Sequence, residues 1–138
     1  MNTAQPDGAE ADKYSPLNLA YVGDAVFSLL VRSEIAARGN MPVGRQNEQA
    51  KGLVRAGAQA AMYHAMLPLL TAEEEAVLKR GRNAKAMSRA KHASMSDYRH
   101  ATAVEALFGY LYLKGCNGRV LELFAACRDG GGEEKGRL

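Results

Sequence analysis

The chain has 138 residues, enough for one domain with a single hydrophobic core. Hydrophobic residues make up 47% of it and charged residues 24%, a balance typical of a globular domain, which excludes a disordered chain and a membrane-spanning one. The formal net charge of +3 permits a nucleic-acid partner without requiring one.

The two ends of the chain differ in composition from its middle. Residues 1–13 carry acidic side chains and no apolar block behind positive charge, so we expect no export signal and a cytoplasmic protein. We expect these residues, and the polar tail 129–138, to be disordered, which leaves one folded domain at 14–128. The two cysteines, Cys116 and Cys127, are too few for a disulfide framework or a zinc site, and we expect both to be reduced.

Between the tails, apolar residues recur every third and fourth position and β-branched residues are sparse, which predicts helices. The first helix is expected to begin at Pro16 after an N-cap at Ser15 and to end before Gly39. Its predicted buried stripe consists of Leu17, Tyr21, Phe27, Val31 and Ile35.

Shorter helices are predicted in the middle of the chain. Residues 43–67 should hold one or two helices, with breaks near Gly52 and Gly57 and an end at Pro68. A capping box of Thr71 and Glu74 then begins a helix that is expected to stop at Gly81.

Two more helices follow a loop at 83–96. They are predicted near 97–112 and at 119–128, so the fold is expected to be all-α. No acidic residue lies between Glu75 and Asp97. This window is either a phosphate-binding surface or an ordinary solvated one, and it contains the basic residues Lys79, Arg80, Arg82, Lys85, Arg89 and Lys91.

An acidic residue interrupts the apolar stripe of the first helix. Asp24 lies seven positions after Leu17 and seven before Val31, so we expect it to face the core. A buried carboxylate needs a basic partner, a proton or a metal ion. The neighbouring Gly23 costs a helix about 1 kcal/mol relative to alanine, which is explained if a second helix approaches its backbone closely.

Glu105 raises the same question in the helix near 97–112, where it shares a face with Thr102 and Gly109. Two acids beside small residues could meet across a helix pair and hold Mg²⁺, which prefers oxygen ligands. From the spacing alone, such acids are more commonly boundary residues or ion-pair partners of a nearby base such as Arg32 or Arg99.

These two segments resemble the ribonuclease III family. Residues 19–26, LAYVGDAV, are similar to its signature helix, and residues 102–109, TAVEALFG, are similar to its second catalytic helix. The resemblance covers about 15–128 and includes the LVR sequence at 53–55. It is closest to the short branch of the family, which lacks a double-stranded-RNA-binding domain, because the chain is short, Thr102 replaces an aspartate, and GRNAK at 81–85 opens the basic loop.

The resemblance implies the ribonuclease III endonuclease fold and a Mg²⁺-dependent endoribonuclease that leaves 5′-phosphate ends, with Mn²⁺ as a substitute. It implies that Asp24 and Glu105 are the catalytic metal ligands. Longer relatives carry two further acids where this chain has Leu17 and Thr102. We therefore expect Asn18 and Thr102 to orient metal-bound waters as neutral groups.

The resemblance also implies partners. Double-stranded RNA is the expected substrate, in the form of precursor 23S ribosomal RNA, with a large-subunit ribosomal protein as a possible presenter and no membrane. RNA binding is assigned to Lys79, Arg80, Arg82, Lys85, Arg89, Lys91 and Arg99. A homodimer is expected, since one site cuts one strand. Because the apolar residues exceed what a small core needs, its interface is assigned to Phe27, Phe108, Leu111 and Tyr112.

Two alternatives stay open. The chain could be a catalytically weak or inactive protein that binds structured RNA during ribosome assembly, which the two missing acids favour. It could also be a helical protein-interaction domain whose acids have no catalytic role. Cleavage of duplex RNA that is lost in Asp24→Asn and in Glu105→Gln separates a nuclease from both.

Overall fold

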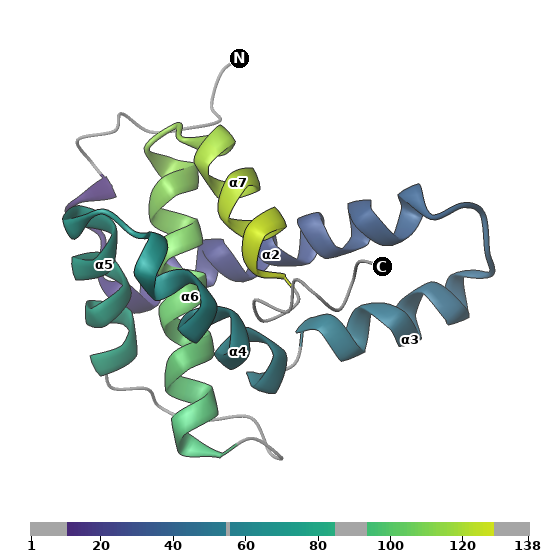
Figure 1. Cartoon of the computed structure of the whole chain (residues 1–138), viewed down its shortest axis with the longest axis horizontal. Coiled ribbons are helices and arrows are strands. Elements are labelled where there is room, and N and C mark those ends of the chain that lie inside the picture. The colour runs from purple at the N-terminus through teal and green to yellow at the C-terminus, as the bar shows by residue number, and fades with distance from the viewer. Residues whose placement is uncertain (1–10, 55, 85–93, 129–138) are drawn as a thin grey trace.

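The computed structural model describes residues 11–54, 56–84 and 94–128, and these residues form helices without strands (Figure 1). The all-α prediction is therefore confirmed. In chain order the elements are α2 (Pro16–Ala37), α3 (Val43–Val54), α4 (Ala56–Met66), the 3₁₀ turn η1 (Leu67–Leu69), α5 (Ala72–Asn83), α6 (Met95–Leu113) and α7 (Asn117–Cys127).

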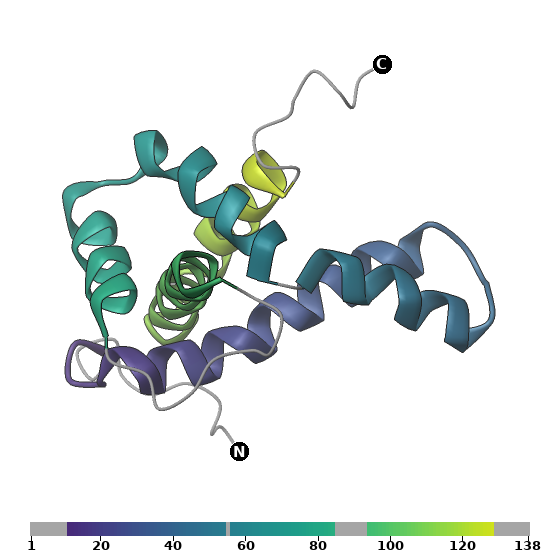
Figure 2. The same cartoon turned by 90° about the horizontal axis from the view of Figure 1, so that it is seen from below.

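Helix α6 lies at the centre of the fold. Figure 2 shows it nearly end-on, with α2, α4 and α5 around it, and these three helices make most of its contacts. It is buried on several sides because it is apolar nearly all round from Ala101 to Leu113. The second half of α2 and the whole of α3 extend away from this body as a hairpin (Figure 1). In the described part of the chain, none of the helices is both long and apolar enough to cross a membrane.

The predicted start and end of the first helix are confirmed, but its buried stripe needs correction. Ser15 Oγ accepts a hydrogen bond from the Asn18 amide at 3.1 Å, and Gly39 has a φ of 122°. Leu17 and Tyr21 were expected in the core but are 37% and 82% exposed. The buried row advances four residues at a time and so winds around the helix axis; it consists of Leu19, Gly23, Phe27, Val31 and Ile35.

Residues 43–67 hold two helices, as the sequence allowed, and the boundary between them lies between the two glycines and not at either one. Gly52 and Gly57 lie inside α3 and α4, which meet between Val54 and Ala56. Gly81 lies inside α5, which continues to Asn83. A methyl group at Gly81 would lie 2.8 Å from the Ala106 side chain, so this glycine serves the close packing of α5 on α6. The two later helices begin two residues earlier than predicted, at Met95 and Asn117.

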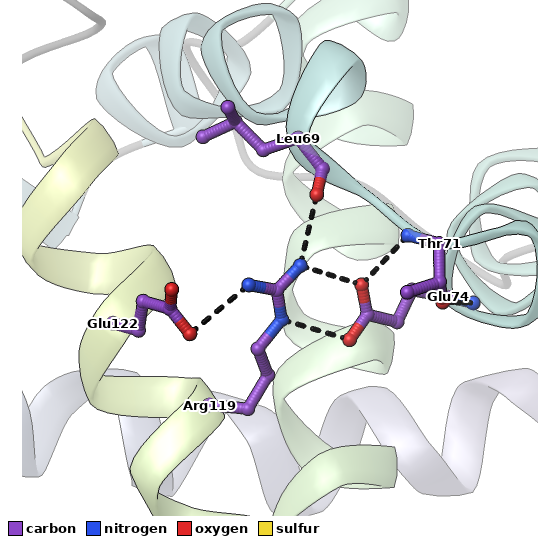
Figure 3. Close-up of polar contacts among 5 residues, drawn as sticks. All are labelled: Leu69, Thr71, Glu74, Arg119 and Glu122. Atoms are coloured by element: carbon purple, nitrogen blue, oxygen red, sulfur yellow. Dashed lines mark hydrogen bonds and ion pairs between the residues drawn. The ribbon is translucent and has the colours of Figure 1, made fainter.

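The predicted capping box at the start of α5 is confirmed, and α7 is attached to it (Figure 3). Thr71 and Glu74 exchange hydrogen bonds of 2.9 and 3.1 Å between side chain and backbone. The Arg119 guanidinium of α7 then donates to both carboxylate oxygens of Glu74, at 2.8 and 2.9 Å, and to the Leu69 carbonyl. One arginine therefore joins α5, η1 and α7.

Described residues also lie before the expected start of the folded domain at residue 14. Ala11 is buried in the core, and Asp12 accepts a hydrogen bond of 2.9 Å from the Tyr110 hydroxyl, although both lie in the segment predicted to be disordered. Residues 1–10 and the predicted tail 129–138 lie outside the described residues. Cys127 is buried and Cys116 partly buried, both as free thiols, as expected.

Candidate functional site

Two glycines bring the backbones of α2 and α6 into direct contact. A methyl group on Gly23 would lie 2.5 Å from the carbonyl carbon of Glu105 and 2.9 Å from the amide nitrogen of Gly109. A methyl on Gly109 would in turn lie 3.0 Å from the Gly23 nitrogen and 2.9 Å from the Leu19 carbonyl carbon. The expected close approach at Gly23 is therefore confirmed, and the second helix is the one that carries Glu105.

Asp24 and Glu105, some eighty residues apart in sequence, meet at this contact. The pKa of Glu105 is raised to about 8, chiefly by burial and then by the negative charge of Asp24. The two carboxyl groups are therefore close enough in space to affect each other. The expected approach of the two acids agrees with this interaction, and their role as metal ligands stays a prediction.

The site is closed toward the core and open toward solvent. Glu105 is partly buried, whereas Asp24 is exposed and lies beside the buried row of α2, so the expectation that it faces the core is wrong. Within the described ranges neither carboxylate forms an ion pair with lysine or arginine, and Arg32 and Arg99 form none with them. The negative charge of the pair thus has no protein counter-ion among these residues.

A third side chain completes the site on its buried side. Gln59 of α4 is 2% exposed, and its Nε2 donates to Glu105 Oε2 at 3.3 Å. Sequence reasoning missed this residue. A signal was present, because Gln59 begins the buried row of α4 that continues with Met62, Tyr63 and Met66, and a polar residue there needs a partner.

The two residues expected to orient waters differ in position. Asn18 is exposed in the first turn of α2, where its backbone amide donates a hydrogen bond to Oγ of the N-cap residue Ser15. Thr102 is buried, and its hydroxyl donates to the Tyr98 carbonyl of its own helix at 2.9 Å. The Thr102 hydroxyl hydrogen is therefore already in use, which leaves its oxygen as an acceptor only.

The basic residues of the predicted RNA surface are partly accounted for. Lys79 and Arg80 are exposed on α5, with Lys79 bridged to Glu75 at 2.9 Å, and Arg99 is exposed on α6. Arg82 is half-buried and donates to the Tyr63 hydroxyl at 3.0 Å. The remaining three, Lys85, Arg89 and Lys91, lie outside the described residues.

The residues expected at a dimer interface lie mostly inside the chain. Phe27 contacts Phe108 and Phe124, with ring centroids 6.0 and 5.7 Å apart, and Leu111 is also buried. Tyr112 is partly buried. Phe27, Phe108 and Leu111 belong to the core of the single chain, so their assignment to an interface needs correction. The apolar side chains that seemed surplus are used to pack α2, α6 and α7 together.

A different set of apolar side chains faces solvent. Leu17, Tyr21, Ala25 and Leu29 follow one another four residues apart on α2, on the opposite side from its buried row. Tyr21 is 82% and Leu29 64% exposed. A ridge of this kind is the shape that packs into a groove of another helix. Asp24 lies next to this ridge, one turn after Tyr21.

The donor set of the site suits a hard divalent cation. Mg²⁺ is commonly held by one or two carboxylates and completes its six ligands with water and phosphate oxygens. Asp24 and Glu105 supply the carboxylates, and the exposure of Asp24 leaves room for the other ligands. Within the described residues, no three His, Cys, Asp or Glu side chains gather around one point.

Comparisons with known proteins identify the family of this chain. Residues 17–115 match the Ribonuclease III domain family. A Mini-ribonuclease 3 from Brevibacillus brevis is 48% identical over 109 residues, which cover 79% of this chain and 81% of the relative. A Mini-ribonuclease 3 from Symbiobacterium thermophilum is 43% identical over 114 residues, covering 83% and 88%.

A solved structure extends the likeness to three dimensions. The crystal structure of a protein from Fusobacterium nucleatum superposes with a TM-score of 0.76 at 28% identity, covering 81% of this chain and 91% of the other. The family match runs from the first turn of α2 to just beyond α6 and thus includes both acids of the site. The expected fold is confirmed by this agreement.

Proposed function

The chain belongs to the ribonuclease III family and is an endoribonuclease of the Mini-ribonuclease 3 type, and on this premise we propose that it cleaves double-stranded RNA at Asp24 and Glu105 with Mg²⁺. The convergence of these two acids on the contact between α2 and α6 is the observation that carries the proposal. Precursor 23S ribosomal RNA is the proposed cellular target, and the cut is proposed to leave 5′-phosphate ends.

The residues of the site divide the work. Asp24 and Glu105 would hold the cation, which supplies an activated water and neutralises charge on the phosphate when bound. Gln59 contacts Glu105 from the core side of the site, and Asp24 lies on the solvent-exposed side, where RNA can approach. Asn18 and Thr102 remain candidates for contacts to metal-bound water, with Thr102 limited to accepting hydrogen bonds. Mn²⁺ should replace Mg²⁺, since it also accepts oxygen ligands.

RNA is proposed to bind through phosphates. Lys79, Arg80 and Arg99 are exposed on two neighbouring helices, and the acid-free window between Glu75 and Asp97 adds positive charge without opposing acids. Duplex RNA is recognised mainly through its phosphates and 2′-hydroxyls, for which such side chains are sufficient. We assign the same role to Arg82, and to Lys85, Arg89 and Lys91 of the undescribed segment.

A homodimer is proposed to form across the outward ridge of α2. The exposed side chains of Leu17, Tyr21 and Leu29 would be covered by the same surface of a second copy, as an isologous interface requires. Because Asp24 lies beside this ridge, two sites would then lie near the two-fold axis and each could cut one strand. Tyr21→Glu should give monomers in sedimentation analysis while Tyr21→Phe stays dimeric. A Tyr21→Glu protein that remains dimeric would place the interface elsewhere.

The catalytic proposal is tested by cleavage of an end-labelled RNA duplex in Mg²⁺. Wild type should cut both strands, whereas Asp24→Asn and Glu105→Gln should each lower the rate by at least about 100-fold with folding intact. Glu34→Gln is the matched control, because Glu34 is an acid of α2 that pairs with Arg128, away from the site. Wild-type protein that binds the duplex but never cuts it in Mg²⁺ or Mn²⁺ would favour the structured-RNA-binding alternative instead.

The cellular target needs a separate test. A transcript in which the two ends of precursor 23S ribosomal RNA pair should be cut at a defined position, faster than a random duplex of equal length. Equal rates for both duplexes would contradict this target. Stimulation by a large-subunit ribosomal protein, added to the same transcript, would support the idea that a protein presents the RNA.

A further inference from the structure

Gln59 is a buried polar residue whose position the packing of α4 does not explain. It is 2% exposed, and the residues that follow it on α4 include Ala60, Met62 and Tyr63, which are all buried. An uncharged amide in such surroundings destabilises the fold unless it is hydrogen-bonded. A leucine or methionine would fill the same space without that cost. Its presence therefore calls for a reason in the group that it contacts.

The other buried polar side chains of the described residues have structural partners. Glu74 caps α5 and pairs with Arg119, and Thr102 bonds to the backbone of its own helix. The amide of Gln59 instead donates to Oε2 of Glu105, which places it against one of the two acids of the proposed metal site. Gln59 thus differs from the other two in contacting a residue of the site.

Helix α4 holds this amide in a fixed place. One turn after Gln59, the Tyr63 hydroxyl accepts a hydrogen bond from Arg82 of α5, and its ring packs on His100 of α6 with centroids 4.3 Å apart. These contacts anchor α4 to the two helices beside it, so the Gln59 side chain approaches Glu105 from a constant direction. A side chain supported in this way loses little further freedom when it binds its partner.

The chemistry of an amide suits a metal ligand that must keep its charge. A lysine or arginine at this position would neutralise Glu105 and compete with a cation for it, whereas an acid would repel it. The neutral Nε2–H of Gln59 occupies one lone pair of Oε2 and leaves the other positions of the carboxylate free. Groups that orient metal ligands in this way commonly change metal affinity 10–100-fold when they are removed.

We propose that Gln59 is a positioning residue for the metal site: from the core side, its amide fixes the carboxylate of Glu105 in the orientation that binds a divalent cation shared with Asp24. This inference rests on the proposed function. It assigns to Gln59 no contact with RNA and no proton transfer, so its effect should appear in metal binding and in kcat rather than in the KM for RNA.

Mn²⁺ binding to the full chain, followed by electron paramagnetic resonance without RNA, tests the proposal. Gln59→Met keeps the length of the side chain and removes its donor, and the Kd for Mn²⁺ should rise about 10-fold or more. Met62→Leu, a core change on the same helix, should leave the Kd unchanged. A Gln59→Met protein with wild-type Kd overturns the inference. Wild-type protein that binds no Mn²⁺ would overturn the proposed function itself, so the two failures are distinguishable.

A second measurement needs no variant and covers the case in which Gln59→Met does not fold. The side-chain amide resonances of Gln59 in wild-type protein should shift as Mg²⁺ is added, because the carboxylate that accepts their hydrogen bond gains a cation. The partly exposed amide of Gln49, whose oxygen accepts a hydrogen bond from Arg38, is the control and should not move. Saturation with Mg²⁺ that moves the Glu105 resonances but leaves those of Gln59 in place would refute the positioning role.

Discussion

Replacing Gly23 with alanine should force α2 and α6 apart. The added methyl would overlap the Glu105 carbonyl oxygen and lie 2.5 Å from the carbonyl carbon, whereas Cβ atoms in proteins essentially never come within 3.0 Å of a neighbour. The backbones must therefore separate by more than about 0.5 Å. Overpacking of this kind costs about 3 kcal/mol when neither neighbour can rotate away, and the better helix propensity of alanine returns about 1 kcal/mol. We therefore expect a net loss of about 2 kcal/mol or more.

Urea denaturation followed by circular dichroism measures this loss, with Gly44→Ala as the control. Gly44 lies in α3 with nothing within 4 Å of the position of a new methyl, so alanine there should raise the free energy of unfolding by about 0.5–1 kcal/mol. Because the separation also moves Asp24 away from Glu105, Gly23→Ala should weaken Mn²⁺ binding, which Gly44→Ala should not. A Gly23→Ala protein as stable as Gly44→Ala would refute the claim that the two helices touch through their backbones.

Residues outside the two-acid site give four further predictions. Arg119→Met should lower the free energy of unfolding by about 2–3 kcal/mol at pH 7, because the largely buried Glu74 carboxylate loses its ion pair; a loss below about 0.5 kcal/mol would contradict this. The pKa of Glu74 is lowered in the folded chain, chiefly by the hydrogen bond from Arg119. As the pH falls, the unfolded chain therefore binds a proton at Glu74 before the folded chain does, which favours unfolding. The stability of the wild type should consequently fall more steeply below pH 4.5 than that of Arg119→Met. Phe27→Ala should cost about 3–5 kcal/mol in the same denaturation assay, as expected for a core ring; a loss under about 1 kcal/mol would instead suit a surface position. Arg80→Gln should reduce the slope of log affinity for duplex RNA against log salt concentration by about 1. Lys79→Gln should reduce it by less, because Glu75 already neutralises Lys79. Equal slopes in the wild type and both variants would exclude α5 from the RNA surface.

Local chemistry made several helix ends predictable. Ser15 and Pro16 start α2, and the Thr71 and Glu74 pair starts α5, because each satisfies free backbone amides with atoms only three residues away. Gly81 misled the same reasoning, since a glycine beside a basic loop reads as a helix end. Gly81 instead allows α6 to pack closely against α5, and this contact between distant segments cannot be recognised from the local sequence.

The site was predictable in part for a similar reason. Asp24 and Glu105 stand out as acids in apolar helices that contain glycines nearby. This local pattern and the resemblance to the ribonuclease III family both indicated a metal site at these two residues. Gln59 gave only a weak signal as a polar residue in the apolar row of α4, because one glutamine in an alanine-rich helix is common and its partner lies 46 residues away. The side of α2 that faces outward was also missed, because periodicity reports that apolar rows exist and not which of them meets the core.

The backbone contact between α2 and α6 has a consequence for how the protein can change over time. The distance between its two acids is set by main-chain atoms at Gly23 and Gly109 and not by the bulk of surrounding side chains. Substitutions elsewhere in the interior can therefore alter the melting temperature while the spacing of the carboxylates stays the same. Related proteins with this fold should therefore be able to differ in melting temperature while keeping the same catalytic geometry, as long as both glycines are retained.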